Sequence, residues 1–384
     1  MYISQAFNVL HEWWRYLVGL VIIIIAVIIG QIPFTVAVFF QAYKNGDSIL
    51  GLDEQKMMSL LEPNLNLFLM LLSFAIGLVG LLLVAKYLHK ETFTQLTTSR
   101  KKIDWKRFWF IFILWGLVSS SFVLIDYYYF SPDDYVVNFK LVPFIILSVI
   151  AILLVPLQTS FEEYLFRGYL MQGIGVSSIY LNFPLIFIYT IICLVSFLYL
   201  NSLYSFSFML GLLIFAFFIG FLFFLLNQKT LLIKLTNSTF YKLLYKILSR
   251  NTTPLLVTSF AFGLLHISNP EVDKLGNVIL IYYIGTGLFL GIMTLMDEGM
   301  ELSLGFHAAN NLFTALLVTA DWTAFQTHSI LKDMSDPTEA GFVDIFMPVF
   351  IVFPIILLIL SKKYRWTNWK EKLFGKVEQP QLEN

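Results

Sequence analysis

Long apolar stretches alternate with short polar connections along the whole chain, and charged side chains lie mostly in the connections. A helix needs about 20 residues to cross a hydrocarbon core about 30 Å thick. Such segments must be helical, because backbone groups in lipid have to pair within the segment. The sequence therefore predicts an all-α polytopic membrane protein, a bundle of about ten transmembrane helices. The expected spans are 17–41, 66–88, 107–128, 141–172, 182–200, 204–226, 254–268, 276–296, 302–320 and 343–361.

The basic residues of the connections follow a regular pattern. Lys and Arg cluster in the segments 86–107, 229–250 and 362–376, whereas the odd-numbered connections are poor in both. Connections rich in Lys and Arg stay on the cytoplasmic side of a membrane. With ten spans every cluster falls on that side, which nine or eleven spans would not allow. The pattern predicts an integral, multi-pass membrane protein with both termini cytoplasmic.

Composition narrows the class of partner. Of 384 residues, 58% are hydrophobic and 13% are charged, and the formal net charge is zero. A chain without excess positive charge offers no field for nucleic acid, so the expected partners are the lipid bilayer and membrane-associated molecules. The one cysteine, Cys193, excludes a disulfide framework or a thiolate metal cluster within the chain.

One apolar run ends in charged residues. No charge occurs from Leu141 to Leu157, and Glu162, Glu163 and Arg167 follow. An ionisable group at membrane depth costs about 2.5–3.5 kcal/mol on insertion scales, so such groups tend to serve a function. Glu163 and Arg167 have the i, i+4 spacing of a helix ion pair. Glu162 lies about 100° further round the helix and is free to act as a base.

A structural alternative explains the same residues without chemistry. Ser160 and Glu163 fit the Ser-x-x-Glu capping box, which would start a new interfacial helix after Pro156. Glu163 and Arg167 would then be an ordinary ion pair on the surface of that helix. The stretch alone leaves both interpretations open.

Two histidines lie inside other apolar runs. Phe262 precedes His266 by one helical turn, and His307 shares a helix face with Asn311 at i, i+4 spacing. Each histidine could be a hydrogen-bonded packing residue or a polar contact between helices. A carboxylate and two imidazoles in a low-dielectric setting are also the parts of a hydrolase. The remaining histidines fall in flanks or loops: His11, His89 and His328.

Taken in order, three short motifs point to a family. They are Glu-Glu-x-x-x-Arg at 162–167, Phe-x-x-x-His at 262–266 and His-x-x-x-Asn at 307–311. The set resembles the signature of the CPBP family of intramembrane glutamic endopeptidases. That family comprises type II CAAX prenyl proteases and bacterial bacteriocin-processing or immunity membrane proteins. The resemblance covers about residues 144–317, and the first three spans and the last lie outside it.

The resemblance implies a role for each matched position. Glu162 would be the general base that activates water, helped by His266. His307 and Asn311 would stabilise the oxyanion. The residues that would support the active helix are Glu163, Arg167 and Phe262. No cofactor and no metal ion is implied, and the reaction would be hydrolysis of a peptide bond near the cytoplasmic membrane face. The substrate would be a membrane-associated peptide or protein, prenylated or not.

The chain departs from the family pattern in one respect. Family members usually have a short link between the first two motifs, whereas Arg167 and His266 are 99 positions apart here. A helical hairpin at 182–226 and a basic segment at 227–250 form an insertion. The basic segment is either an amphipathic helix on the inner membrane surface or a cytoplasmic loop.

Three regions follow from this division. Residues 1–140 would form an N-terminal membrane region with three transmembrane helices. Residues 141–320 would form the CAAX-protease-like catalytic membrane domain, with the insertion at 182–250. Residues 321–384 would hold the last transmembrane helix and a basic cytoplasmic tail.

The sequence leaves two other functions open. Glu162, His266 and His307 could bind a catalytic zinc ion, although the chain lacks His-Glu-x-x-His. The polar cluster could also serve structurally in a non-enzymatic immunity or scaffold protein of the same family. Asn310 is a second candidate amide beside Asn311, and the helical spacing favours Asn311.

Overall fold

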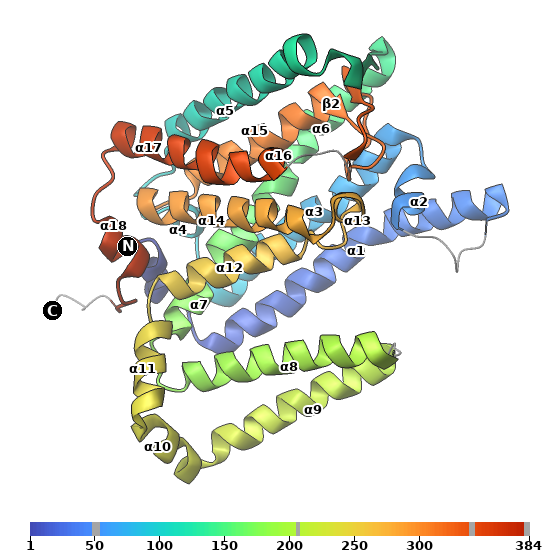
Figure 1. Ribbon diagram of the computed structural model, residues 1–384. Coiled ribbons are helices and arrows are strands. Elements are labelled where there is room, and N and C mark those ends of the chain that lie inside the picture. Colours follow the sequence, from blue (N-terminus) through green and yellow to red (C-terminus); the bar gives the residue numbers. More distant parts are fainter. Residues whose placement is uncertain (48–53, 205–207, 338–341, 380–384) are drawn as a thin grey trace.

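The computed structural model describes residues 1–47, 54–204, 208–337 and 342–379. In this part of the chain nearly every element is a helix (Figure 1), which confirms the all-α polytopic prediction. A short 3-10 helix, Ile3–Asn8, opens the chain. The helices before the carboxylate motif are α1 (Trp13–Asn45), α2 (Glu54–Ser59), α3 (Pro63–Leu83), α4 (Phe93–Thr97) and α5 (Trp105–Ile125). π-helical turns extend α3 over Val84–His89 and α5 over Asp126–Phe130.

The carboxylate motif lies in one continuous helical rod. This rod consists of α6 (Leu141–Glu163), a π-helical turn (Tyr164–Leu170) and α7 (Met171–Ser177). It passes through Pro156 without a break. Ser160 therefore lies inside a helix and caps nothing, so the capping-box alternative is wrong. π-helical turns occur often at functional sites, and this one begins directly after Glu163.

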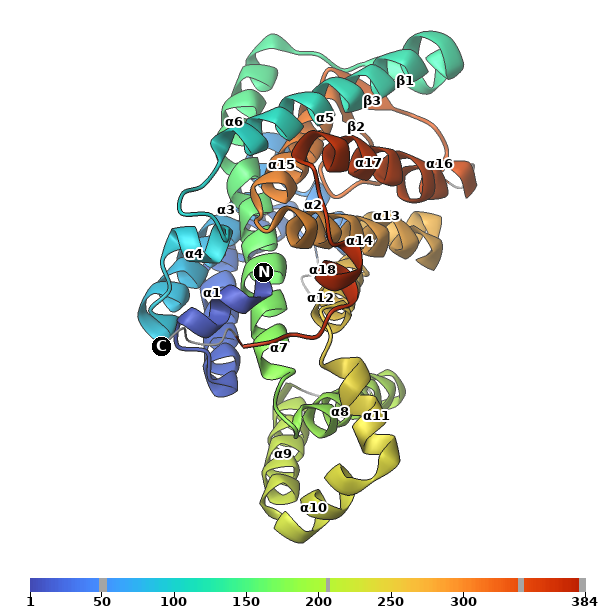
Figure 2. The ribbon, with the colours of Figure 1, turned by 90° about the vertical axis from the view of Figure 1, so that its left-hand side faces the viewer.

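The insertion is a helical hairpin followed by two short helices. These elements are α8 (Phe183–Tyr204), α9 (Phe208–Asn227), α10 (Lys229–Asn237) and α11 (Thr239–Leu248). Figures 1 and 2 both show the hairpin standing apart from the rest of the bundle, to which it is joined by the turn after α7 and through α10 and α11. The Tyr241 and Tyr245 hydroxyls donate to the carbonyls of Leu181 and Ile179. The basic segment is therefore helical, as the amphipathic alternative expects.

The remaining helices complete the bundle. They are α12 (Thr252–Leu264), α13 (Pro270–Leu275), α14 (Leu280–Asp297), α15 (Glu301–Leu317), α16 (Phe342–Met347), α17 (Phe353–Tyr364) and α18 (Trp369–Phe374). A 3-10 turn, Asn277–Ile279, precedes α14, and a π-helical turn, Pro348–Val352, precedes α17. α15 lies in the middle, because it packs against α5, α6 and α14.

The described residues contain six segments long and apolar enough to cross a membrane, judged by length and composition. They are Trp13–Asn45, Pro63–His89, Trp105–Phe130, Leu141–Ser177, Asn277–Asp297 and Ile345–Tyr364. The other four expected spans correspond to α8, α9, α12 and α15. α12 has 13 residues and α15 has 17, so both are shorter than a full crossing of about 20.

Glycines let α12 approach α14 closely. A Cβ added at Gly263 would lie 2.7 Å from the backbone nitrogen of Ile284, and one at Gly287 would lie 2.8 Å from the carbonyl oxygen of Ser259. Both distances are too short for any side chain. Only glycine at these two positions lets the helices approach so closely.

The two ends of the bundle differ. The N-terminal 3-10 helix and the segment after α18 meet at one end, where the Ser4 hydroxyl donates to the carbonyl of Glu378. At the other end, β1 (Tyr135–Val137), β2 (Val318–Thr319) and β3 (Leu331–Asp333) form a sheet in the order β1-β3-β2. β1 pairs antiparallel with β3 and β2 pairs parallel with it, with Val137 and Val318 both opposite Leu331. This sheet ties the connection before α6 to the segment that follows α15.

Candidate active site

Glu163 is the anchor of the polar cluster. Its side chain is fully buried, and its Oε1 accepts from Arg167 Nη1 at 3.1 Å. Arg167 is equally buried, and its Nη2 donates to the carbonyl of Gly287 at 3.0 Å. The guanidinium carbon lies 4.5 Å from the ring centroid of Phe262, in a cation–π contact. The expected ion pair is therefore present, and it joins the rod to α12 and α14.

His307 lies between the two adjacent carboxylates. Its Nδ1 is 2.9 Å from Glu163 Oε1, and its Nε2 is 3.5 Å from Glu162 Oε2. A carboxylate oxygen can only accept, so Nδ1 carries a proton and donates it to Glu163. The other nitrogen, Nε2, consequently faces the carboxyl group of Glu162. The imidazole is nearly buried, with 7% of its side chain exposed.

Glu162 keeps one oxygen without a partner. Its Oε1 accepts from Gln158 Nε2 at 2.5 Å, whereas the buried Oε2 makes no hydrogen bond within the part of the chain that the structure describes. The side chain is 12% exposed, in contrast to the fully buried Glu163. Glu163 Oε2 also lacks a hydrogen-bond partner among the described residues, but Glu163 is fully buried and paired with Arg167. The partly exposed Glu162 is therefore the better placed of the two to meet water as a base.

Asn311 joins the cluster through Gln158, a residue that the sequence reasoning missed. The Asn311 amide nitrogen donates to Gln158 Oε1 at 3.2 Å. Gln158 is buried and lies one helical turn before Glu162. The i, i+4 spacing of Gln158 and Glu162 is the feature of the sequence that could have indicated this contact. The neighbouring amide, Asn310, accepts from Trp115 Nε1 at 3.0 Å, so it serves a different contact.

His266 lies beside the cluster rather than in it. The helix expected to contain His266 ends at Leu264, and His266 follows in a turn. Its Nδ1 is 2.8 Å from the carbonyl oxygen of Phe262, and its ring stacks on Tyr283 at 4.3 Å between centroids. The Phe262 ring separates the two imidazoles, with centroids 4.9 Å from His266 and 5.9 Å from His307. Among the described residues no polar contact joins His266 to Glu162.

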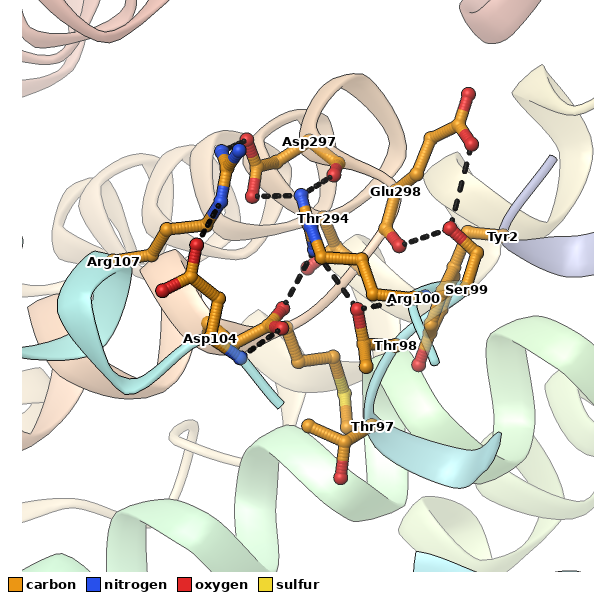
Figure 3. Close-up of polar contacts among 12 residues, drawn as sticks. Tyr2, Thr97, Thr98, Ser99, Arg100, Asp104, Arg107, Thr294, Asp297 and Glu298 are labelled. Atoms are coloured by element: carbon orange, nitrogen blue, oxygen red, sulfur yellow. Dashed lines mark hydrogen bonds and ion pairs between the residues drawn. The ribbon is translucent and has the colours of Figure 1, made fainter. Parts of the chain in front are cut away.

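A charged cap closes the end of the α14–α15 turn (Figure 3). Asp297, at the end of α14, and Glu301, at the start of α15, are both buried. Arg100 donates to Asp297 Oδ2 at 2.9 Å and to Glu301 Oε2 at 3.1 Å, and it also donates to the Asp297 carbonyl. Arg107 Nη1 and Trp366 Nε1 donate to Asp297 Oδ1 at 2.5 and 2.9 Å. These contacts fix the first residue of α15, six positions before His307.

The cap reaches the C-terminal helix. Lys372 Nζ lies 2.9 Å from Glu298 Oε1 and donates to the carbonyl of Met296. Burial acts to raise the pKa of Glu298, but the hydrogen bond and charge of Lys372 outweigh it and hold the pKa below its ordinary value. α18 therefore contacts the same turn as Arg100.

Comparison with known proteins agrees with the three motifs. Residues 237–313 match the family model described as type II CAAX prenyl endopeptidase Rce1-like. The matched segment contains His266, His307 and Asn311, while the Glu-Glu-x-x-x-Arg motif lies before it. The family resemblance drawn from the motifs is thus confirmed, and it supports an intramembrane protease of the CAAX type in a multi-pass membrane protein.

A bacterial relative extends the similarity beyond that domain. The chain is 25% identical over 307 residues to "Uncharacterized protein YyaK" of Bacillus subtilis (strain 168), and the match covers 80% of this chain and 78% of YyaK. No solved structure matches the chain. In the described part of the chain, no group of three or more His, Cys, Asp or Glu side chains could hold a metal ion.

Proposed function

We propose that this Rce1-like protein is an intramembrane endopeptidase that hydrolyses a peptide bond near the cytoplasmic membrane face, with Glu162 as the base. One observation carries the proposal. Glu162 Oε2 is buried and has no hydrogen-bond partner among the described residues, and it faces His307 Nε2 at 3.5 Å. A carboxylate in that position can take a proton from a water molecule held beside it.

The reaction would begin when Glu162 accepts a proton from water and the hydroxide oxygen bonds to the scissile carbonyl carbon. Charge then develops on the carbonyl oxygen, where His307 Nε2–H and the Asn311 amide would donate. His307 can donate from Nε2 only as an imidazolium, because Nδ1–H is already directed at Glu163. The Glu163 carboxylate stabilises that cation. Glu162 would finally pass its proton to the leaving nitrogen as the carbon–nitrogen bond breaks.

His266 would assist from the other side of Phe262. Its Nδ1 lies against the Phe262 carbonyl, so the proton resides on Nδ1 and Nε2 carries the lone pair. Catalytic hydrogen bonds are often long in an empty site and shorten when substrate binds. We therefore assign His266 to orienting the water in the substrate complex.

The partners follow from the same assignment. The bilayer would surround the bundle, and the substrate would be a membrane-associated peptide or protein, with or without a prenyl group. The basic segments 86–107, 229–250 and 362–376 favour an orientation with both termini in the cytoplasm. No cofactor is required by these steps.

The direct test uses the purified full-length chain in lipid vesicles. Its probes would be a farnesylated CAAX-type peptide, the same peptide without the lipid, and a set of membrane-anchored peptides, with products identified by mass spectrometry. Glu162→Gln should lower kcat/KM by roughly 10²–10⁴-fold. The exposed Glu12→Gln serves as the matched control and should cleave normally.

Two outcomes would favour the other candidate functions. Loss of activity in a strong chelator, with zinc found by elemental analysis, would support a zinc hydrolase with Glu162, His266 and His307. Absence of cleavage of every probe, with full complementation of a knockout phenotype by His266→Ala, would support a non-enzymatic membrane protein.

A further inference from the structure

A chain of hydrogen bonds runs across three helices and ends on Glu162. Trp115 Nε1 on α5 donates to Asn310 Oδ1 at 3.0 Å, and Asn310 Nδ2 donates to Asn311 Oδ1 at 3.2 Å. Asn311 Nδ2 then donates to Gln158 Oε1 at 3.2 Å. Gln158 Nε2 donates to Glu162 Oε1 at 2.5 Å. The chain therefore connects α5, α15 and α6.

The direction of this chain is fixed by its two ends. An indole nitrogen can only donate, and an ionised carboxylate can only accept. Each of the three amides between them must therefore present its oxygen toward Trp115 and its nitrogen toward Glu162. Hydrogen bonds that follow one another in one direction polarise each other, most strongly where water is scarce.

The chain determines which atoms of the site stay available. Gln158 occupies Oε1 of Glu162, which leaves Oε2 directed at His307. The Asn311 oxygen is occupied by Asn310 and one amide hydrogen by Gln158, which leaves its second amide hydrogen as a donor. One buried glutamine thus sets both the free oxygen of the base and the free donor of the amide.

We propose that Gln158 is a positioning residue that couples Glu162 to Asn311. Trp115 and Asn310 orient this hydrogen-bond chain from its α5 end. The proposal rests on the proposed peptidase function. Gln158 does not react with substrate. It acts by fixing the rotamers of the two groups that do, and such fixation affects the transition state more than substrate binding.

The test compares Gln158→Met with Gln172→Met in the same vesicle assay. Methionine keeps the length of the side chain and removes both hydrogen bonds. Gln172 is a buried glutamine of the same continuous helical rod and lies outside the polar cluster. We expect Gln158→Met to lower kcat by roughly 10–100-fold with KM nearly unchanged, and Gln172→Met to leave both unchanged. Equal thermal unfolding midpoints would show that both variants fold.

A second variant tests whether the hydrogen bonds from Trp115 to Glu162 act together. Trp115→Phe removes the indole donor but keeps an aromatic ring against Phe306, which stacks on Trp115 at 4.5 Å. We expect roughly a 3–10-fold loss of kcat from this variant. Because the two residues act through one chain, adding Trp115→Phe to Gln158→Met should cost nothing more.

The outcomes separate this proposal from the function on which it rests. Wild-type kcat in Gln158→Met, together with an inactive Glu162→Gln, would overturn the positioning role and leave the peptidase intact. If the losses of kcat in the double variant were fully additive, Trp115 would not act through Gln158, and only the coupling along the hydrogen-bond chain would be overturned. An active Glu162→Gln would overturn the proposed function itself.

Discussion

His307 donates its Nδ1 proton to Glu163 Oε1 across 2.9 Å, and the same oxygen accepts from Arg167 at 3.1 Å. A single carboxylate oxygen thus serves a cation on its own helical rod and an imidazole on α15. This arrangement explains why the motif contains two glutamates. Glu163 is fully buried and its Oε1 binds both Arg167 and His307, whereas Glu162 is 12% exposed and keeps Oε2 directed at His307.

The buried pair gives the first prediction. Glu163→Leu leaves the Arg167 guanidinium buried without its counter-ion, and breaking such a pair costs about 3–5 kcal/mol. We expect a large fall in the thermal unfolding midpoint of the purified protein. The double variant Glu163→Leu/Arg167→Met should recover most of the stability but no activity, because His307 still lacks its acceptor. The exposed pair of Glu12 and Arg15 provides the control, and Glu12→Leu should change little.

The helices, the Glu163–Arg167 pair and the placement of His307 with Asn311 could be predicted, because each depends on spacing within one helix. Contacts between helices could not. Asn311 and Gln158 are 153 positions apart, and Arg100 and Glu301 are 201 apart. Such pairs depend on how each helix is rotated and how closely it packs, and neither follows from the hydrophobic period. The position of His266 also differs from expectation, because α12 ends at Leu264 instead of continuing to 268.

The charged cap gives the second prediction. Arg100→Met leaves two buried carboxylates, Asp297 and Glu301, with one cation fewer, and we expect a loss of about 3–5 kcal/mol in unfolding free energy. The start of α15 should loosen, so kcat should fall as His307 shifts. Lys101 is exposed next to Arg100, and Lys101→Met serves as the control. Equal unfolding midpoints in the two variants would show that the cap does not hold α15.

Glu91 gives the third prediction, which concerns pH. This carboxyl group lies in the connection after the span Pro63–His89, and burial raises its pKa to about 8. In the unfolded chain the pKa returns to about 4.5. Between these values the unfolded state is charged and the folded state is protonated, so stability is greatest below pH 4.5 and falls as the pH rises toward 8.

The dependence of the unfolding free energy on pH can be measured, and a substitution at Glu91 should remove it. Each pH unit in that window should cost up to about 1.4 kcal/mol from this group alone. Glu91→Gln keeps the neutral shape, so its unfolding midpoint should exceed that of the wild type at pH 8 and match it at pH 4.5. Parallel curves for the two proteins across the whole range would contradict the assignment of this slope to Glu91.

The close contact of α12 with α14 gives the last prediction. Gly263→Ala adds a Cβ that would lie 2.4 Å from Ile284 Cγ1 and 2.7 Å from the Ile284 backbone nitrogen, so α12 must move away. His266 follows three residues later and moves with it, so kcat should fall together with stability. At Gly220 on α9, a Cβ meets nothing within 4 Å. Gly220→Ala should therefore stabilise the protein by about 0.5–1 kcal/mol, because alanine favours the helix. An equal gain in stability from both substitutions would mean that α12 and α14 do not pack as closely as described.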